Sequence, residues 1–282
     1  MIDLHMHTNA SDGRQGPEEL VARAAAAGIR TLSVTDHDTM ASVPAAAAAA
    51  AARGIELVPG IEMTAVHAGR DVHVLGYYVE ADAPELRAHT DAQRTSRVQR
   101  AREIADRLAR LGAPIDIDGL VARAPAGDAK SLARPQIARA LVEAGHVGSV
   151  QEAFDRFLAD GCPAYLPNEG KSPAEVVGII GRAGGIASLA HPGPLGQDEL
   201  IPALAAAGLA AIEVYHCAHD DQARHRYREM ARRHGLAVSG GSDYHGEGVR
   251  RAEFLGKVVL PPADFAVLRE RAARIRSTAA RH

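Results

Sequence analysis

The sequence IDLHMH, residues 2–7, places two histidines at the end of a short apolar segment. Hydrophobic and polar residues alternate along it, which is typical of a β-strand. Residues two apart on a strand face the same side, so the side chains of His5 and His7 are predicted to project together. Such a pair can bind one metal ion, although two polar residues also occur at strand ends without a metal. The segment therefore indicates a strand, and a metal site only if further ligands converge on it.

Strands and helices alternate up to about residue 80. Pro17 is expected to begin a helix that Gly28 ends, and an alanine-rich helix follows the second strand, Thr31–Thr35. Two further strands are predicted at Leu57–Ala65 and Asp71–Val79. This order predicts a mostly parallel sheet with helices on its outside.

The alternation stops after residue 82. An arginine-rich stretch, Leu86–Leu111, is predicted to form one long helix, and the helices that follow come without a strong strand signal. We therefore divide the chain into a barrel, residues 1–82 and 168–282, and a helical insertion, residues 83–167, that covers the active site.

Alternation of strands and helices resumes at Ser172, which with Glu175 is predicted to form a capping box at the start of a helix. The later strands are expected at Ile186–Ala190, Ala211–Tyr215, Leu236–Gly240 and Leu255–Leu260. About seven strand–helix repeats can be counted, close to the eight of a complete barrel.

Composition limits the classes of function. With 282 residues, of which 46% are hydrophobic, the chain can bury the core of a large α/β domain. A formal net charge of −3 does not favour general nucleic-acid binding, so a polyanionic substrate needs local positive charge or metal ions. Two cysteines without CxxC spacing, no visible signal sequence and no long apolar run predict a cytoplasmic protein that is not bound to a membrane. We expect no obligate protein partner.

Metal-binding residue types recur at the ends of the predicted strands. Each lies at or just after a short apolar run, and together they are His5, His7, Asp12, His37, Glu62, His73, His191, Asp243 and His245. Imidazoles and carboxylates gathered at successive strand ends can hold divalent cations. Two or three ions that share a carboxylate fit this number of ligands better than one ion does. The cluster indicates metal-assisted hydrolysis, and a metal-binding module without catalytic activity is the alternative from a different class.

Six short motifs make the chain similar to a known family. They are HMH at 5–7, TDHD at 35–38, GIE at 60–62, HV at 73–74, AHP at 190–192 and SDYH at 242–245. In these residues the chain resembles the polymerase and histidinol phosphatase (PHP) family, whose barrels are similar to those of amidohydrolases. The resemblance implies a distorted (β/α)7 TIM-like barrel with a trinuclear metal centre, and amide hydrolysis is formally possible because related barrels perform it.

The resemblance also implies which residues hold each ion. One ion would be held by His5, His7, Glu62 and Asp243, a second by Asp12, His37 and His245, and a third by His73 and His191 with Glu62 as the bridge. His191, Asp243 and His245 are the predicted catalytic residues. Some family members have histidine at the position of Asp12, and the harder carboxylate ligand favours Mn²⁺ over Zn²⁺, with Fe and Mg as further alternatives.

Basic residues beside predicted helix starts are candidates for binding a phosphate. Lys130, Ser131 and Arg134 precede or begin one helix, Lys171 precedes another, and Arg14 follows the first ligands closely in sequence. A helix N-terminus with such side chains is a good phosphate site, although each residue can equally be a solvated one.

The stretch ARPQIARALVEAG at 133–145 is similar to one branch of the family, which contains nucleoside 3′,5′-bisphosphate phosphatases and 5′-end-directed exoribonucleases. Members of that branch often have Gly and His where this chain has Ala133 and Gln136, whereas Arg134 is retained. The resemblance implies removal of the 3′-phosphate from a small nucleotide such as adenosine 3′,5′-bisphosphate, with Arg134 and Lys171 holding the 5′-phosphate. A 5′-to-3′ exonuclease on short RNA and a histidinol-phosphate type of phosphatase are the alternatives.

The remaining histidines and tyrosines have weaker signals. His216, Cys217 and His219 match no ligand position, although they could line a pocket. Tyr215 or Tyr244 could stack on a nucleotide base. The other histidines are expected to be exposed, namely His67, His89, His146, His225, His234 and His282.

Overall fold

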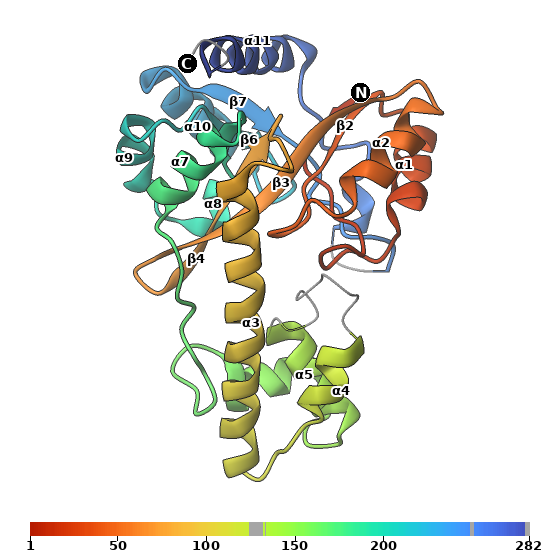
Figure 1. Ribbon diagram of the computed structural model, residues 1–282, viewed down its shortest axis with the longest axis vertical. Coiled ribbons are helices and arrows are strands. Elements are labelled where there is room, and N and C mark those ends of the chain that lie inside the picture. Colours follow the sequence, from red (N-terminus) through yellow and green to blue (C-terminus); the bar gives the residue numbers. More distant parts are fainter. Residues whose placement is uncertain (124–131, 133, 249–250, 280–282) are drawn as a thin grey trace. The chain divides into compact units, whose positions relative to one another are not determined.

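The computed structural model describes the chain except for residues 124–131, 133, 249–250 and 280–282. It divides into two compact units (Figure 1). The first, here called the barrel unit, consists of Met1–Ala88 and Gly170–His282, and the second, the helical unit, is His89–Glu169. The long helix α3, Pro84–Arg110, begins in the barrel unit and continues into the helical unit.

Seven strands form one sheet in which spatial order follows chain order. They are β1 (Ile2–Asp3), β2 (Thr31–Val34), β3 (Glu56–His67), β4 (Arg70–Tyr77), β5 (Ile186–Leu189), β6 (Ala211–Tyr215) and β7 (Ala237–Gly240). β4 runs antiparallel to both β3 and β5, and all other neighbouring pairs are parallel. The sheet is therefore mostly parallel, as expected, with one strand reversed.

Backbone hydrogen bonds join the two edges of this sheet. The amide of Leu4 donates to the carbonyl of Gly240 at 3.1 Å, and the amide of Asp243 donates to the carbonyl of His5 at 2.8 Å. Met6 and Tyr244 form a parallel bridge just beyond the ends of β1 and β7. The sheet is thus a nearly closed seven-stranded barrel, which confirms the predicted (β/α)7 TIM-like architecture.

The strand expected at Leu255–Leu260 does not form. Gly256 has a φ of 73°, and this left-handed conformation turns the chain in the middle of the apolar run. Only the end of the segment touches the sheet, where the amide of Leu260 donates to the carbonyl of Ile2 at 2.9 Å. The prediction of a strand at Leu255–Leu260 was therefore wrong, and the sheet formed by the described residues has seven strands.

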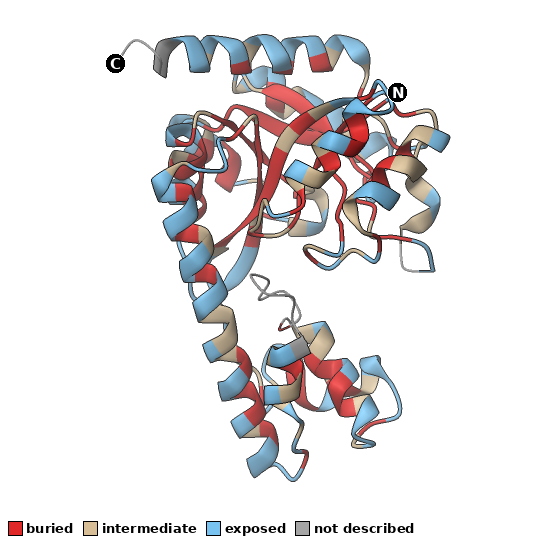
Figure 2. Cartoon of the chain, turned by 45° about the vertical axis from the view of Figure 1, so that its right-hand side comes forward, coloured by how far each residue is buried: buried red, intermediate tan, exposed pale blue. Residues whose placement is uncertain are grey.

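Helices surround the barrel, and two of them begin at the predicted residues Pro17 and Ser172–Pro173. The helices are α1 (Pro17–Ala26), α2 (Val43–Ala51), α7 (Pro173–Arg182), α8 (Pro192–Leu195), α9 (Leu200–Ala206), α10 (Asp221–Arg233) and α11 (Pro262–Ala279). The predicted capping box is present at α7, where Ser172 and Glu175 bond each other's backbone amides. Buried residues follow the strands and the inner faces of these helices (Figure 2).

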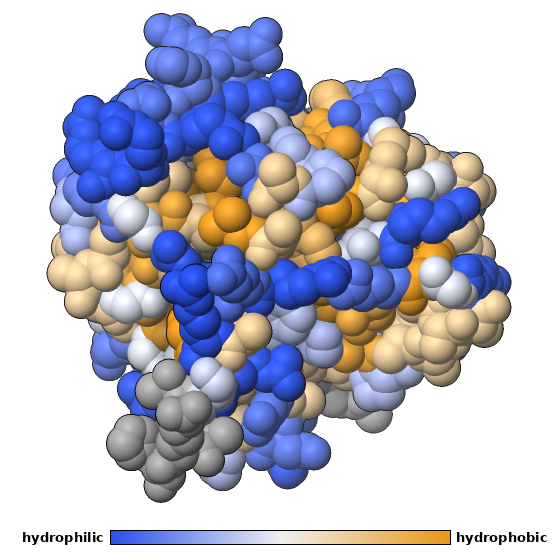
Figure 3. Space-filling view, turned by 90° about the horizontal axis from the view of Figure 1, so that it is seen from above, coloured by the Kyte–Doolittle hydropathy of each residue, from blue (hydrophilic) through white to orange (hydrophobic). Residues whose placement is uncertain are grey.

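The face of the molecule on the side of α11 carries both hydrophilic and apolar residues (Figure 3). Seen from that side, hydrophilic side chains cover much of the face, and apolar atoms appear between them (Figure 3). Among the described residues, no helix combines the length and the apolar character that crossing a bilayer requires.

The helical unit has its own core. After α3 it contains α4 (Ile117–Arg123), α5 (Arg134–Glu143), α6 (Val150–Ala153) and a π-helical turn at Phe154–Leu158, with no strand among its described residues. Arg100 and Arg107 connect α3 to the segment after the π-helical turn by donating hydrogen bonds to the carbonyls of Leu166 and Tyr165.

The expectation that His89 is exposed was wrong. This residue of α3 is buried, with a relative exposure of 4%.

Gly241 follows β7 and packs so closely against the first strand that a methyl group has no room. A Cβ at this position would lie 2.3 Å from the backbone nitrogen of His5 and 2.5 Å from its Cβ. We predict that Gly241→Ala lowers the free energy of unfolding by about 1–3 kcal/mol, because overpacking displaces backbone that cannot yield.

The matched control is Gly181→Ala in α7, where the described structure places nothing within 4 Å of an added Cβ beyond the helix itself. Helix propensity predicts a gain of up to about 1 kcal/mol there. Urea denaturation of both variants tests the prediction, and equal stabilities would contradict it.

Candidate metal centre

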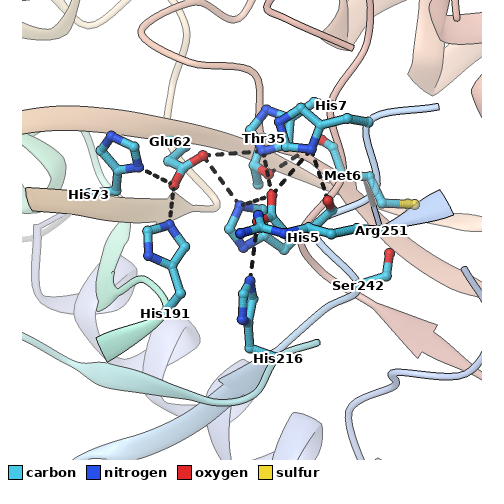
Figure 4. A network of polar contacts seen from close by, with 12 residues as sticks. His5, Met6, His7, Thr35, Glu62, His73, His191, His216, Ser242 and Arg251 are labelled. Carbon is cyan, nitrogen blue, oxygen red and sulfur yellow. Dashed lines mark hydrogen bonds and ion pairs between the residues drawn. The ribbon is translucent and has the colours of Figure 1, made fainter. Parts of the chain in front are cut away.

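The ligand-type side chains gather around Glu62, which lies in β3 with its side chain 1% exposed (Figure 4). Its Oε2 atom lies 3.3 Å from Nε2 of His5, 3.2 Å from Nε2 of His7 and 3.3 Å from Nδ1 of His37. These imidazoles come from the ends of β1 and β2. One oxygen of the carboxylate therefore faces two neighbouring strand ends.

The other oxygen of Glu62 faces the next two strands. Oε1 lies 3.0 Å from Nδ1 of His73 and 3.1 Å from Nε2 of His191. His73 lies early in β4 whereas His191 follows β5, and the reversed direction of β4 brings both to the same rim. A carboxylate with imidazoles against each oxygen is well placed to bridge two cations.

Asp243 and Asp12 bring the remaining predicted residues into the cluster. Oδ1 of Asp243 lies 3.3 Å from Nε2 of His7 and 3.4 Å from Nε2 of His5. Oδ1 of Asp12 lies 3.1 Å from Nε2 of His245, and its Oδ2 lies 3.9 Å from Nε2 of His37. The structure thus places all nine residues predicted as metal ligands at one end of the barrel.

Three groups of these residues offer ligand atoms that all lie within 4.8 Å of one another. The groups are His7, Asp12, His37 and His245; His5, His7 and Asp243; and His37, Glu62 and His73. They overlap the ligand sets implied by the family resemblance without being identical to them. Their nitrogen and carboxylate donors suit Mn, Fe or Zn better than Mg, which prefers oxygen ligands.

Hydrogen bonds fix which nitrogen of several imidazoles faces the centre. Nδ1 of His5 donates to Glu213 at 2.8 Å, and Nδ1 of His245 lies 2.8 Å from the carbonyl of Asp243. A carbonyl can only accept, so Nε2 of His245 carries the lone pair. In both rings Nε2 is the atom that faces the neighbouring carboxylates, as metal ligation requires.

Two buried nitrogens of the cluster support a metal-binding role more directly. Nε2 of His7 and Nδ1 of His73 are buried and make no well-directed hydrogen bond within the described part of the chain, although carboxylate oxygens lie 3.0–3.3 Å away. A buried polar atom without a directed hydrogen bond is unfavourable, and a bound cation would satisfy both lone pairs. The donor set therefore fits divalent cations.

The charges of the cluster without a cation explain its pKa values. Burial lowers the pKa of His37 to about 3 and that of His191 to about 4, so both rings are neutral near pH 7. Burial also disfavours charge on His5, but the carboxylates of Glu213 and Glu62 outweigh it and raise the pKa of His5 to about 10. A proton on His5 balances negative charge that a cation would otherwise balance.

The backbone is strained beside two of the predicted ligands. His191 has a φ of 27° and Asp243 a φ of 53°, both in the region that non-glycine residues rarely adopt. Each such residue costs about 1–3 kcal/mol, and strain of this kind is concentrated at functional sites. The packing around the barrel end must therefore hold both turns in place.

The sequence interpretation missed Glu213 and Arg251 as parts of this site, and it gave His216 only as a residue that could line a pocket. Glu213 accepts from Nδ1 of His5 and, at 2.8 Å, from the backbone amide of His191. His216 and Arg251 both contact the carboxylate of Asp243. The carboxylate inside the apolar run AIEVY was a signal for Glu213, whereas no local pattern indicated the ion pair between Arg251 and Asp243.

The predicted phosphate-binding residues are placed only in part. Arg134 begins α5 in the helical unit, where it donates to the carbonyl of Leu158 at 3.3 Å and to Asp160 at 3.2 Å. In the barrel unit Lys171 lies 3.9 Å from Glu175, and the backbone amide of Arg14 donates to the carbonyl of His245 at 2.9 Å. Two further candidates, Lys130 and Ser131, lie outside the described residues.

One of the two candidates for stacking on a base is excluded by the structure. Tyr244 is 1% exposed and packs in the core against α1 and α2, so it cannot stack on a ligand. The guanidinium of Arg228 lies 5.5 Å from the ring centre of Tyr215, close enough for a cation–π contact. Of the histidines expected to be exposed, His282 lies outside the described residues.

Comparison with known proteins agrees with this arrangement. A family model described as the PHP domain matches residues 3–99. A 3′,5′-nucleoside bisphosphate phosphatase of Chromobacterium violaceum is 36% identical over 279 residues, which cover 97% of each chain. The 5′-3′ exoribonuclease Rnm of Salmonella typhimurium is 34% identical over 252 residues, covering 87% of this chain and 85% of that protein.

A solved structure is similar over the same extent. A candidate metal-dependent phosphoesterase from Bifidobacterium adolescentis superposes with a TM-score of 0.84 at 32% identity, covering 96% of each chain. Similarity at this level extends over the barrel and the helical unit alike. The chain therefore belongs to the PHP family of metal-dependent phosphoesterases.

Proposed function

We propose that this protein hydrolyses the 3′-phosphate of nucleoside 3′,5′-bisphosphates, such as adenosine 3′,5′-bisphosphate, to the 5′-nucleotide and phosphate. The observation that carries the proposal is the similarity to the C. violaceum phosphatase, which extends over 97% of both chains. It includes the helical unit, in which Arg134 lies, as well as the metal-binding end of the barrel.

The predicted ligand sets assign three cations to the cluster. We propose Mn²⁺ as the ion, with Zn, Fe and Mg as alternatives, held by His5, His7, Glu62 and Asp243, by Asp12, His37 and His245, and by His73, His191 and Glu62. When bound, such cations stabilise developing charge on a phosphate and activate water at neutral pH.

The side chains proposed as catalytic act through charge and lone pairs. His191 has a pKa of about 4, so its ring is neutral near pH 7 and is a weak proton acceptor. His245, with a pKa that burial also lowers, is held by the carbonyl of Asp243. We infer that His191, Asp243 and His245 act by holding the cations that would orient and stabilise the reacting phosphate group, and that they do not transfer protons.

We propose that Arg134 and Lys171 hold the 5′-phosphate, and that Lys130, Ser131 and Arg14 add to phosphate binding. Arg134 is the first residue of α5, and its side chain is 28% exposed. Its guanidinium lies 5.3 Å from the ring centre of Tyr165. The planar fork of an arginine matches two phosphate oxygens at once, which a lysine cannot do. Binding the non-reacting phosphate in this way would position the reacting one.

One alternative has specific support. Relatives from Salmonella typhimurium and Escherichia coli, both 34% identical over 252 residues, are named 5′-3′ exoribonucleases. The same chemistry would then release nucleotides from the 5′ end of short RNA. A histidinol-phosphate type of phosphatase and a non-catalytic metal-binding module are supported by no separate observation.

A phosphate-release and product assay with Mn²⁺ tests the proposed function. The substrates are adenosine 3′,5′-bisphosphate, 3′-AMP, 5′-AMP, histidinol phosphate and a 5′-phosphorylated oligoribonucleotide. We expect the bisphosphate to have the highest kcat/KM, because it alone offers both a reacting 3′-phosphate and a 5′-phosphate for Arg134. Faster removal of nucleotides from the oligonucleotide would instead favour the exoribonuclease, and no turnover of any substrate would contradict catalysis.

Replacing Arg134 by alanine should distinguish binding of the 5′-phosphate from hydrolysis of the 3′-phosphate. A charge-assisted hydrogen bond contributes about 1.5–3 kcal/mol, so Arg134→Ala should lower kcat/KM for the bisphosphate roughly ten- to hundredfold. An aryl phosphate lacks the second phosphate, and its kcat/KM should change little.

Arg156→Ala is the matched control, since Arg156 is an exposed arginine of the same unit that pairs with Glu152 at 2.7 Å. Steady-state kinetics of both variants on both substrates provide the measurement. Equal losses on the two substrates in Arg134→Ala would reject the proposed role.

A further inference from the structure

β6 contributes no residue to the predicted ligand set, although each of the other six strands, or the residues that follow it, does. The ligands come from β1, β2, β3, β4, β5 and β7 or from the residues that follow them. The chain beyond β6 nevertheless enters the same cluster, since the ring of His216 lies 5.3 Å from that of His191 and 6.2 Å from that of His5. His216 is fully buried, and its side chain points toward the cluster (Figure 4).

The hydrogen bonds of His216 indicate its tautomer. The backbone amide of Ala218 lies 3.1 Å from Nδ1 of His216, and an amide can only donate. Nδ1 therefore carries the lone pair, and the proton of the ring is on Nε2. That proton points to Oδ2 of Asp243, which lies 3.1 Å from Nε2.

The two oxygens of Asp243 consequently have different surroundings. Oδ1 lies 3.4 Å from Nε2 of His5 and 3.3 Å from Nε2 of His7, and both nitrogens belong to predicted metal ligands. Oδ2 faces His216 and also Arg251. One oxygen is thus held by hydrogen-bond donors while the other is directed at the predicted metal position.

We propose that His216 is a positioning residue that donates from Nε2 to Asp243 and thereby directs the other oxygen of this carboxylate to the metal. The inference rests on the metal centre of the proposed function but not on the identity of the substrate. An oriented carboxylate binds a cation with less loss of rotational freedom. His216 itself is not a ligand, because the proton on Nε2 occupies the atom that faces the cluster.

Two substitutions separate the donor role from local structure. His216→Asn keeps a side-chain acceptor near Nδ1 for the amide of Ala218, but it is too short to reach Asp243. His216→Gln places an amide donor near the position of Nε2. The matched control is His225→Asn, which removes an exposed imidazole from α10.

Affinity for Mn²⁺ is measured by calorimetric titration of the metal-depleted full-length protein, without substrate. His216→Asn should weaken binding of one ion roughly ten- to hundredfold, as substitutions behind metal ligands do, whereas His216→Gln should restore most of it. His225→Asn should bind as the unaltered protein does. Thermal denaturation of each metal-depleted variant checks that the fold is intact.

An affinity of His216→Asn equal to that of the unaltered protein would overturn the inference and leave Arg251 to hold Asp243 alone. Equal losses in the Asn and Gln variants would overturn the donor role. If His216→Asn does not fold, nitrogen-15 NMR of the unaltered metal-depleted protein still decides, because an Nε2 without a proton could not donate to Asp243. Failure of the bisphosphate assay with normal metal affinities would reject the substrate and not this role.

Discussion

The contact between the carboxylate of Glu62 and five surrounding imidazoles is the interaction on which the rest of the site depends. Both oxygens are buried, and each faces rings that come from different strands. Neither a lone carboxylate nor several protonated imidazoles can be buried without a balancing charge. The end of the barrel can keep these groups together only if protons or cations balance them. The same constraint that makes the cluster costly therefore favours the binding of cations there.

The direction of the strands explains how one rim collects these residues. In the parallel strands the predicted ligands lie at or after the C-terminal end, as with His37 after β2 and His191 after β5. β4 runs the other way, so His73 lies near its beginning and still reaches the same rim. β6 supplies orienting groups in place of ligands, with Glu213 against His5.

The architecture and the convergence of the nine predicted residues could be foreseen because they depend on residue type and strand periodicity. Histidines and carboxylates at successive strand ends converge in any barrel of this kind, whatever its loops. The expected strand at Leu255–Leu260 failed because a left-handed glycine interrupts an apolar run that periodicity alone cannot distinguish from a strand.

Orienting contacts were harder to predict, since they join residues far apart in the chain. His216 and Asp243 are 27 residues apart, and nothing near either one in sequence indicates their hydrogen bond. His89 was expected to be exposed because a histidine on a charged helix usually is, and only the packing of α3 shows otherwise. The substrate residues depend on loops and on the helical unit, where sequence patterns are weakest.

The most direct test of the account is anomalous diffraction from crystals grown with Mn²⁺, recorded at the manganese absorption edge. The account predicts anomalous peaks within coordination distance of both oxygens of Glu62, one of them also next to Asp243. Crystals that show no such peak at Glu62, or cations bound only elsewhere on the barrel, would contradict it.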